Sequence, residues 1–255
     1  MSDSVIKTAA RVFEVLEYMR SMRRSTTVRE ISEELGYPLS SAQMLLKSIA
    51  QLGYLRYDAR RRAYLATPRL ALLGDWVLEG MAMMGVNSQT LEEIVKETGL
   101  TAILGVENDI YVQYTHVAIA GRGPAQYRVQ PGTRRLLCMS SLGWALLSKE
   151  SRDHVSRIVS RTNSRLSGTG QDVSLLEVET HIHQAATHGY AYSQGVTNPD
   201  RAMISVVTKA DEAGMRYAVG ISGALEEISS RQDEIVSLLK ARIVAPEDEG
   251  RGLKA

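Results

Sequence analysis

At 255 residues the chain is long enough for two domains, and its 44% hydrophobic and 23% charged residues are ordinary for a soluble globular protein. No run of about eighteen apolar residues occurs and no charged-then-apolar pattern opens the chain, so we expect neither a membrane span nor a secretory signal. Cys138 is the single cysteine, which rules out an intrachain disulfide and favours a cytoplasmic location.

Residues 4–66 are predicted to form a winged helix-turn-helix domain, which opens with a helix ending near Met22. Thr27 and Glu30 have the spacing of a capping box, in which each side chain accepts a backbone N–H at the start of a helix. This second helix is expected to end at Gly36, which suits a left-handed cap. Two amphipathic helices joined by the short turn that follows must cross steeply, as in a helix-turn-helix.

The third helix is predicted to begin with Ser40 as its N-cap and to end at Gly53. One face is apolar, and the other is polar toward the N-terminus, the end that a recognition helix inserts into the major groove. With Thr27 from the preceding helix start, the residues expected to contact DNA here are Ser40, Ser41, Gln43, Met44 and Lys47.

A basic hairpin follows, because residues 54–57 and 63–65 alternate like strands around a turn that carries Arg60, Arg61 and Arg62. Such a wing suits the phosphate backbone or the minor groove. Residues 5–70 hold 12 Lys and Arg against 6 Asp and Glu, whereas residues 81–255 hold 18 against 20. A positive excess confined to this module predicts binding to double-stranded DNA, although a winged helix used only for protein contacts is the alternative.

Residues 67–86 are predicted to form a linker helix, with Thr67 as N-cap and Pro68 at the first helical position. Apolar residues from Leu70 to Met84 occupy more than one face of it. A helix that connects two domains and packs against a second subunit would show this pattern. A core helix of one larger domain is the alternative.

Residues 87–245 combine short strands, hairpin turns and helices, which predicts an α+β domain around a mostly antiparallel sheet. Helices are expected from Ser88, Ser140, Arg152 and Ser174, and a final one over residues 226–243. Strands are expected near residues 100–106, 110–117, 126–129, 190–193, 202–208 and 215–222. The charged residues 246–255 are expected to be disordered.

No catalytic, metal or cofactor site is predicted. His181 and His183 point to different faces of a helix and are interpreted as solvated. Cys138 lies in an apolar run and is interpreted as a buried small hydrophobe, not a nucleophile. An enzyme with a DNA-binding appendage would need a nucleophile and base that the sequence does not supply. A DNA-binding protein whose second domain serves only for oligomerisation is a further alternative.

The chain resembles the isocitrate-lyase-regulator (IclR) family of bacterial transcription factors over nearly its whole length. The resemblance rests on residues 36–46, then Gly132, residues 141–147, Gly189-Tyr190 and Ser222-Gly223, in that order and spacing. It implies a winged helix-turn-helix, a linker helix and a GAF-like effector-binding domain. It also implies dimers or dimers of dimers on a near-palindromic operator, with repression of a catabolic operon favoured over activation and no enzymatic activity.

By position in the family, the effector pocket is expected to involve one helix start and three late strands, at Ser140, Ser141, Leu142, Gly143, Ser193, Met203, Gly220 and Ser222. Relatives that bind small polar acids tend to have an acid, a Cys and a Ser in place of Ser193, Met203 and Gly220. The resulting pocket is less charged and roomier, so we expect a larger, partly aromatic or amphipathic acid. Met44 and Gln43 also depart from the family's usual basic residue and frequent His, so base preference does not transfer.

Overall fold

The structure, a computed structural model, describes residues 6–77, 85–121, 129–196 and 198–244, and the chain divides into two compact units, residues 1–78 and 79–255. Several predicted features lie outside the described residues. They are the first residues of the opening helix, the end of the linker helix, the strand near residue 126 and the tail 246–255.

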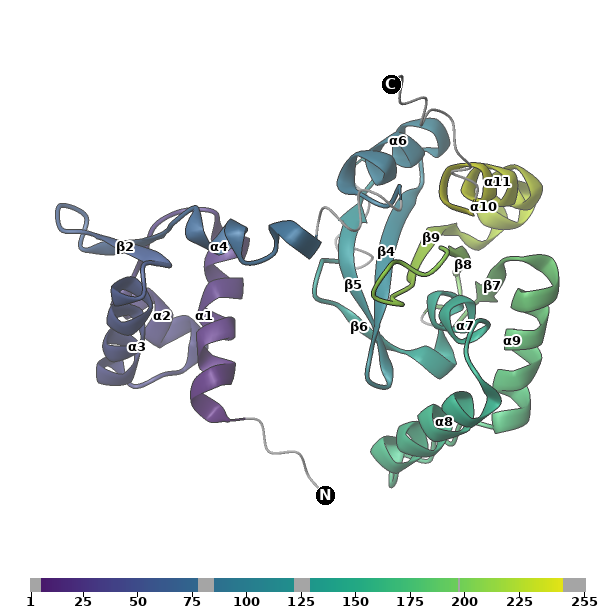
Figure 1. The fold of residues 1–255 in the computed structure, drawn as a ribbon, viewed down its shortest axis with the longest axis horizontal. Coiled ribbons are helices and arrows are strands. Elements are labelled where there is room, and N and C mark those ends of the chain that lie inside the picture. Colours follow the sequence, from purple (N-terminus) through teal and green to yellow (C-terminus); the bar gives the residue numbers. More distant parts are fainter. Residues whose placement is uncertain (1–5, 78–84, 122–128, 197, 245–255) are drawn as a thin grey trace, which may run out of the picture. The chain divides into compact units, whose positions relative to one another are not determined.

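The first unit is a three-helix winged helix-turn-helix (Figure 1). Its three-stranded antiparallel sheet has the order β1-β3-β2. The elements are α1 (Lys7–Met22), β1 (Thr26–Thr27), α2 (Val28–Leu35), α3 (Leu39–Gln51), β2 (Leu55–Asp58) and β3 (Ala63–Ala66). Ile31 of α2 and Leu46 of α3 are fully buried where the apolar stripes of the helices meet, which is the packing that the helical spacing predicted.

Two local predictions in this unit were wrong. The helix start is at Leu39, with Pro38 as N-cap and the N–H of Ala42 bonded to the Pro38 carbonyl, so Ser40 lies inside the first turn. Phe13 was expected on the apolar, inward face of the first helix, but it is 65% exposed, because α1 turns Val15 and Met19, four residues apart, toward the core. Phe13, two residues before Val15 on the helix, therefore lies on the opposite, exposed side.

The linker region also differs from the prediction. Instead of one continuous helix, α4 (Arg69–Leu72) ends at Leu73, Gly74 lies in a turn, and helix resumes at residues 75–77. Thr67 does not cap α4, because its hydroxyl donates to the backbone oxygens of Gly53 (2.7 Å) and Tyr54 (3.2 Å). Glycine has a low helix propensity, which accounts for a break at that position.

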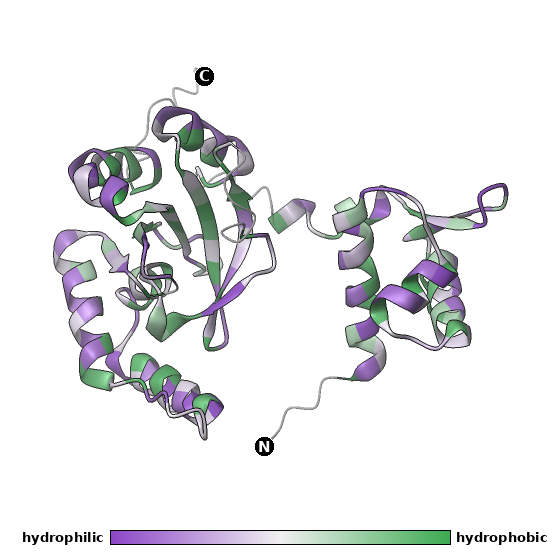
Figure 2. Ribbon diagram, turned by 180° about the vertical axis from the view of Figure 1, so that it is seen from behind, coloured by the Kyte–Doolittle hydropathy of each residue, from purple (hydrophilic) through white to green (hydrophobic). Residues whose placement is uncertain are grey.

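The second unit is built on a six-stranded sheet in the order β6-β5-β4-β9-β8-β7, antiparallel at every described pairing. Figure 2 shows hydrophobic residues concentrated on the central strands, while the surrounding helices mix hydrophobic and hydrophilic residues. The strands are β4 (Thr101–Asn108), β5 (Tyr111–Ala118), β6 (Arg134–Leu136), β7 (Ala191–Gln194), β8 (Arg201–Val207) and β9 (Tyr217–Ala224). The predicted α+β class with an antiparallel sheet is therefore confirmed.

Helices cover both faces of this sheet, and the strand register assigns residues to each face. Ser205 and Gly220 are paired across β8 and β9 and face α7 (Ser141–Leu147), whose Ser141 hydroxyl lies 2.9 Å from that of Ser205. Gly223 lies three residues after Gly220 in β9 and therefore on the opposite face of the sheet. A side chain there would meet Ile228 of α10 (Leu225–Ser230). The other helices are α6 (Ser88–Thr98), α8 (Arg152–Leu166), α9 (Leu175–His188) and α11 (Gln232–Leu239).

Helix ends in this unit match the predictions in most places. Ser140 and Ser174 cap α7 and α9 as expected, but Asn87, not Ser88, caps α6, with its Oδ1 accepting the N–H of Thr90 at 2.9 Å. The predicted final helix is broken into α10, α11 and a π-helical turn, η3 (Lys240–Val244). The break is at Arg231, which leaves helical geometry and whose guanidinium donates to the Thr98 carbonyl at 2.8 Å. Among the described helices, none has the length and apolar character required to cross a membrane.

Candidate DNA-binding surface and effector pocket

The recognition face of α3 is the outward side of the helix. Ser40, Gln43 and Lys47 are exposed, Met44 is 72% exposed, and Ser41 is half-buried. Within the part of the chain that the structure describes, no hydrogen bond engages the amide of Gln43 or the ammonium of Lys47. The structure therefore places four of the five predicted residues of this helix, all but the half-buried Ser41, on its exposed face, and leaves the polar groups of Gln43 and Lys47 available to a ligand.

The wing between β2 and β3 presents Arg60, Arg61 and Arg62, all exposed. The Asp58 carboxylate shapes the turn, because its Oδ1 accepts the backbone N–H groups of Arg60 at 2.9 Å and Arg61 at 3.2 Å. Arg62 has a φ of 49°, the left-handed conformation that closes the loop. The rigid turn keeps three cations close together at the tip, a geometry that suits phosphate contacts.

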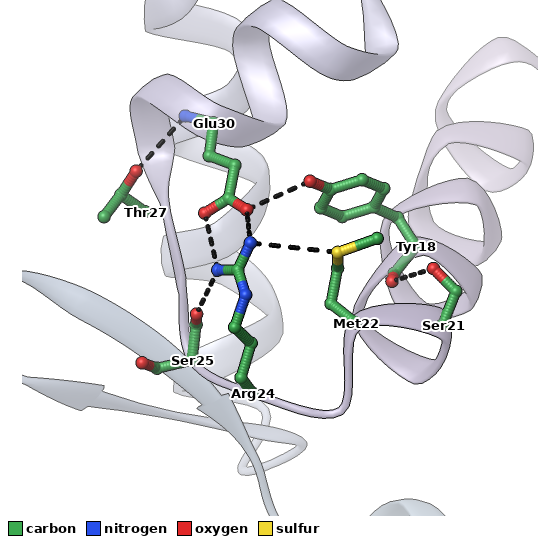
Figure 3. Close-up of polar contacts among 7 residues, drawn as sticks. All are labelled: Tyr18, Ser21, Met22, Arg24, Ser25, Thr27 and Glu30. Atoms are coloured by element: carbon green, nitrogen blue, oxygen red, sulfur yellow. Dashed lines mark hydrogen bonds and ion pairs between the residues drawn. The ribbon is translucent and has the colours of Figure 1, made fainter.

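A polar cluster around Glu30 connects the end of α1 to the start of α2 (Figure 3). Arg24 donates from Nη1 to Glu30 Oε2 at 3.1 Å and to the Ser25 carbonyl at 3.0 Å, and Tyr18 donates its hydroxyl to Glu30 Oε1 at 3.0 Å. The hydrogen bond from Arg24 holds the pKa of Glu30 below its usual range. A hydrogen bond from the Thr27 backbone also stabilises the Glu30 carboxylate, as the predicted capping box requires, and Arg24 is paired within the protein.

Thr27 has a structural role. Its hydroxyl accepts the backbone N–H of Glu30 at 3.2 Å, which confirms the predicted cap of α2, and β1 pairs it with Ala63 of the wing. The hydroxyl of Thr27 thus serves as the N-cap of α2. A DNA contact from this residue stays a prediction.

Tyr37, which the sequence reasoning passed over, fixes the turn before the recognition helix. Its side chain is buried, its hydroxyl donates to the Glu14 carboxylate of α1, and the Arg11 guanidinium lies 4.7 Å from its ring centroid. Ser32 donates its hydroxyl to the Tyr37 carbonyl at 2.6 Å. Burial, followed by the contact with Glu14, raises the pKa of Tyr37 to about 12. An aromatic side chain in a turn of otherwise small residues was the signal for it.

A cavity lies where the effector pocket was predicted in the second unit, between the start of α7 and the ends of β7, β8 and β9. It is a small cavity of about 60 Å³. Five of the eight predicted residues line it, namely Ser140, Ser141, Ser193, Met203 and Ser222. The register explains the last three, because Ser193 pairs with Met203 and Met203 with Ser222, which places one row of side chains on the face toward α7.

The other three predicted residues do not line the cavity. Leu142 is fully buried in the core beneath α7. A Cβ at Gly143 would lie 2.1 Å from the Leu137 carbonyl oxygen, so this glycine lets the helix approach the preceding backbone. A Cβ at Gly220 would meet Ser205 Oγ at 2.7 Å and Met203 Sδ at 3.0 Å. These positions shape the pocket through packing.

Arg201 and Tyr114 line the cavity although neither was predicted to. Arg201 opens β8, two residues before Met203 and therefore on the same face, and its Nη2 donates to Ser222 Oγ at 3.5 Å. Tyr114 is 4% exposed, and burial raises the pKa of its hydroxyl. Strand alternation counted back from Met203 would have found Arg201. The position of Tyr114 at the cavity could be found only from the pairing of β5 with β4 in the structure.

The residues weighed as catalytic or metal-binding have other surroundings. Cys138 is 4% exposed and burial raises the pKa of its thiol, which confirms the interpretation of a buried small hydrophobe. His181 is not a solvated surface histidine, because its ring stacks on Trp144 with centroids 3.8 Å apart. Among the described residues, no group of three or more His, Cys, Asp or Glu is arranged to hold a metal ion.

A winged helix-turn-helix with a basic wing, followed by a unit with a small pocket against its sheet, defines a ligand-binding transcriptional regulator. Residues 8–59 match the sequence profile of the IclR helix-turn-helix domain, and residues 76–245 match that of the bacterial transcriptional regulator IclR C-terminal domain. The chain therefore belongs to the IclR family of bacterial transcriptional regulators, which bind DNA through the first domain and are not enzymes.

Relatives and solved structures agree with this assignment. The transcriptional repressor IclR of Escherichia coli is 19% identical over 195 residues, which is 73% of this chain and 69% of that protein. The IclR regulator of Alicyclobacillus acidocaldarius has a TM-score of 0.67 at 20% identity, covering 94% of this chain and 97% of that one. An IclR homologue of Microbacterium hydrocarbonoxydans, solved with 4-hydroxybenzoate, has a TM-score of 0.65 at 18% identity, covering 93% and 99%.

Proposed function

We propose that this regulator is a cytoplasmic, effector-responsive repressor of a catabolic operon. It would bind a near-palindromic operator as a homodimer or dimer of dimers. The proposal of DNA binding rests on one observation. Exposed side chains suited to DNA, namely Gln43, Lys47 and the wing arginines, all lie in the unit that has a net positive charge. Repression is supported by the E. coli relative, which is named a repressor.

Self-association is supported by the linker region of the first unit. Leu72, Leu73 and Trp76 are 65%, 58% and 71% exposed, and side chains of this kind are seldom left together in water. A second copy of the chain packing on them would bury this apolar surface. Two recognition helices related by a two-fold axis would then read two half-sites of one operator.

The effector is proposed to be an organic acid whose carboxylate meets Arg201 and the Ser140 and Ser141 hydroxyls. These groups converge on the cavity from β8 and the start of α7. We propose an acid with one aromatic ring or an amphipathic chain, because the flexible Met203, whose thioether lies over Gly220, can change conformation and open space there. The 4-hydroxybenzoate bound to the M. hydrocarbonoxydans homologue gives this class a precedent.

Pocket size sets a condition on that proposal. Typical ligand pockets have volumes of about 300–1,000 Å³, whereas this cavity has about 60 Å³. An aromatic acid must therefore displace Met203 or Val196, while a two- or three-carbon oxoacid would fit without such movement. The same small volume favours the alternative function, a constitutive DNA-binding protein whose second unit binds no effector.

A thermal-shift screen tests the effector class. Benzoate and hydroxybenzoates at millimolar concentration should raise the melting temperature of the native protein and should not raise that of Arg201→Ala. Binding of glyoxylate or pyruvate with no response to the aromatic acids would refute the aromatic proposal. Footprinting on the native operator with and without each hit then separates an effector-responsive regulator from a constitutive one.

Mechanistically, the ligand would act through a population shift. A carboxylate bound between Arg201 of β8 and Ser141 of α7 would connect the strand to the helix, as the buried Ser141–Ser205 contact already does. If one arrangement of the dimer holds these groups closer, ligand binding favours that arrangement. The spacing of the two recognition helices, and so the operator affinity, would change with it.

A further inference from the structure

A second, larger cavity lies in the same unit, between α9, the start of α7 and β7. This α9 cleft has a volume of about 640 Å³, within the range of small-molecule sites. It borders the effector pocket, because Met139, Ser193 and Val196 line both. The resemblance and the comparisons assign nothing to the α9 cleft.

The floor of the α9 cleft is apolar and rigid. Trp144 is 4% exposed and its indole N–H donates to the Cys138 carbonyl at 2.8 Å, which fixes the ring. His181 stacks on this indole with the ring planes 7° apart and also lines the cleft. Other buried apolar residues complete the floor, namely Val178, Ala185 and Ala191. A flat imidazole above a held indole gives a surface on which an aromatic ring can stack.

The charged groups of the α9 cleft are of one sign. Asp172 and Glu177 both line it and are exposed, and no Lys or Arg occurs among its described lining residues. Glu177 and His181 are four residues apart on α9, so they share a face of the helix. Burial lowers the pKa of His181 below its ordinary 6.5, so its ring is uncharged at neutral pH.

Hydrogen-bonding groups face the same space. The Tyr190 hydroxyl accepts from Gln232 Nε2 at 2.8 Å, and the Tyr192 hydroxyl lies 3.1 Å from Ser229 Oγ. Both tyrosines line the cleft and are half-buried. An occupant therefore meets an apolar floor, phenol hydroxyls on one wall and carboxylates at the end where α9 begins.

We propose that the α9 cleft is a second small-molecule site, whose ligand is a cationic aromatic amine. The ring of the amine stacks on His181, and its ammonium group meets the carboxylates of Glu177 and Asp172. The helix dipole by itself explains an acidic residue in the first turn of α9. It does not explain an aromatic floor with two carboxylates, and no Lys or Arg among the described lining residues, around 640 Å³ of space.

Trp144 makes the site directly measurable, because the chain has only two tryptophans and Trp76 is the other. In a Trp76→Phe protein, emission excited at 295 nm comes from the cleft floor alone. Tyramine and 3-(4-hydroxyphenyl)propionate serve as probes with the same phenol ring and opposite charges. We expect tyramine to change Trp144 emission saturably, and the acid to have no such effect at equal concentration.

Three further variants locate the binding. Glu177→Gln should weaken tyramine binding about threefold to fivefold, the effect of losing one exposed charge contact, and adding Asp172→Asn should weaken it about tenfold. Glu212→Gln, an equal charge change at an exposed residue outside the cleft, should leave it unchanged. Arg201→Ala, which alters only the effector pocket, should also leave it unchanged.

The opposing outcomes are distinct. No saturable tyramine signal up to 10 mM (on the order of the weakest specific affinities) overturns the proposal. So does a signal that Glu177→Gln leaves intact, or one that disappears in Arg201→Ala, which would place the amine in the effector pocket. Because the site and its test do not depend on Arg201 or on DNA, the proposed effector function can fail while this inference holds.

Discussion

The hydroxyls of Ser141 and Ser205 lie 2.9 Å apart, and both residues are fully buried. Ser141 is the first residue of α7 and Ser205 lies in β8, 64 positions later, so this hydrogen bond joins the helix to the middle of the sheet. It lies at the base of the effector pocket, which Ser141 lines. The position of the pocket wall therefore depends in part on this buried polar contact, beside the packing of the buried Leu142 over Gly220.

Replacing either serine should reveal this dependence. Ser205→Ala leaves the Ser141 hydroxyl buried without its partner and should lower the free energy of unfolding by about 1–3 kcal/mol. The double variant Ser141→Ala/Ser205→Ala should cost less than the sum of the single ones, because it leaves no unpaired hydroxyl. Urea unfolding measures all three. Additive losses would show that the two hydroxyls are not coupled.

The wing arginines should contribute to affinity for every DNA sequence. Replacing Arg60, Arg61 and Arg62 with Ala should weaken binding to operator and random duplex alike. It should also reduce the slope of log K against log salt by up to about 3, since each phosphate contact contributes roughly 0.9. Fluorescence anisotropy at several salt concentrations measures both. Arg157→Ala/Arg165→Ala, at exposed positions on α8, is the control and should change neither quantity.

Gln43 should act on base preference instead. An amide can bond a base edge in two places, so Gln43→Ala should cost about 1–3 kcal/mol on the operator and little on random DNA. Binding to a library of operator variants measures the change in preference. Ser48→Ala, on the same helix but with its hydroxyl bonded to the Met44 carbonyl, is the matched control. Equal losses on operator and random DNA would count against a base contact by Gln43.

The stacked His181 should make the stability of the second unit depend on pH. Burial lowers the pKa of His181 in the folded protein below its ordinary 6.5, so between these two values the unfolded chain binds more protons. Stability is therefore fully present above about pH 6.5 and should fall as the pH drops through the folded pKa. His181→Phe keeps a flat ring and should flatten this dependence. His183→Gln, exposed on the same helix, should preserve it.

Gly143 should tolerate no side chain. Gly143→Ala places a Cβ 2.1 Å from the Leu137 carbonyl oxygen, so the start of α7 must move away from the backbone before it. A loss of about 3 kcal/mol or more is expected in thermal or urea unfolding. Gly74→Ala is the control, because no atom lies within 4 Å of the added Cβ. An unaffected Gly143→Ala protein would mean that α7 is free to shift.

Most of the first unit could be predicted because its signals are local. The cap at Thr27, the ending at Gly36 and the strands flanking the arginine turn each depend on residues a few positions apart. The charge excess of the same segment needs no structure at all. The predicted start at Ser40 was wrong, because the backbone geometry of Pro38 lets the helix begin directly after it, at Leu39.

By itself, then, the sequence determined the α+β class and the DNA-binding module, while its resemblance to a family indicated the row of strand residues at the predicted effector pocket. Only the tertiary structure paired Arg24 with Glu30, brought Arg201 into that pocket and stacked His181 on Trp144. The reason is physical. Helix caps and strand alternation follow from neighbouring residues, but the partners of a buried or charged group are chosen by the packing of segments far apart in the chain.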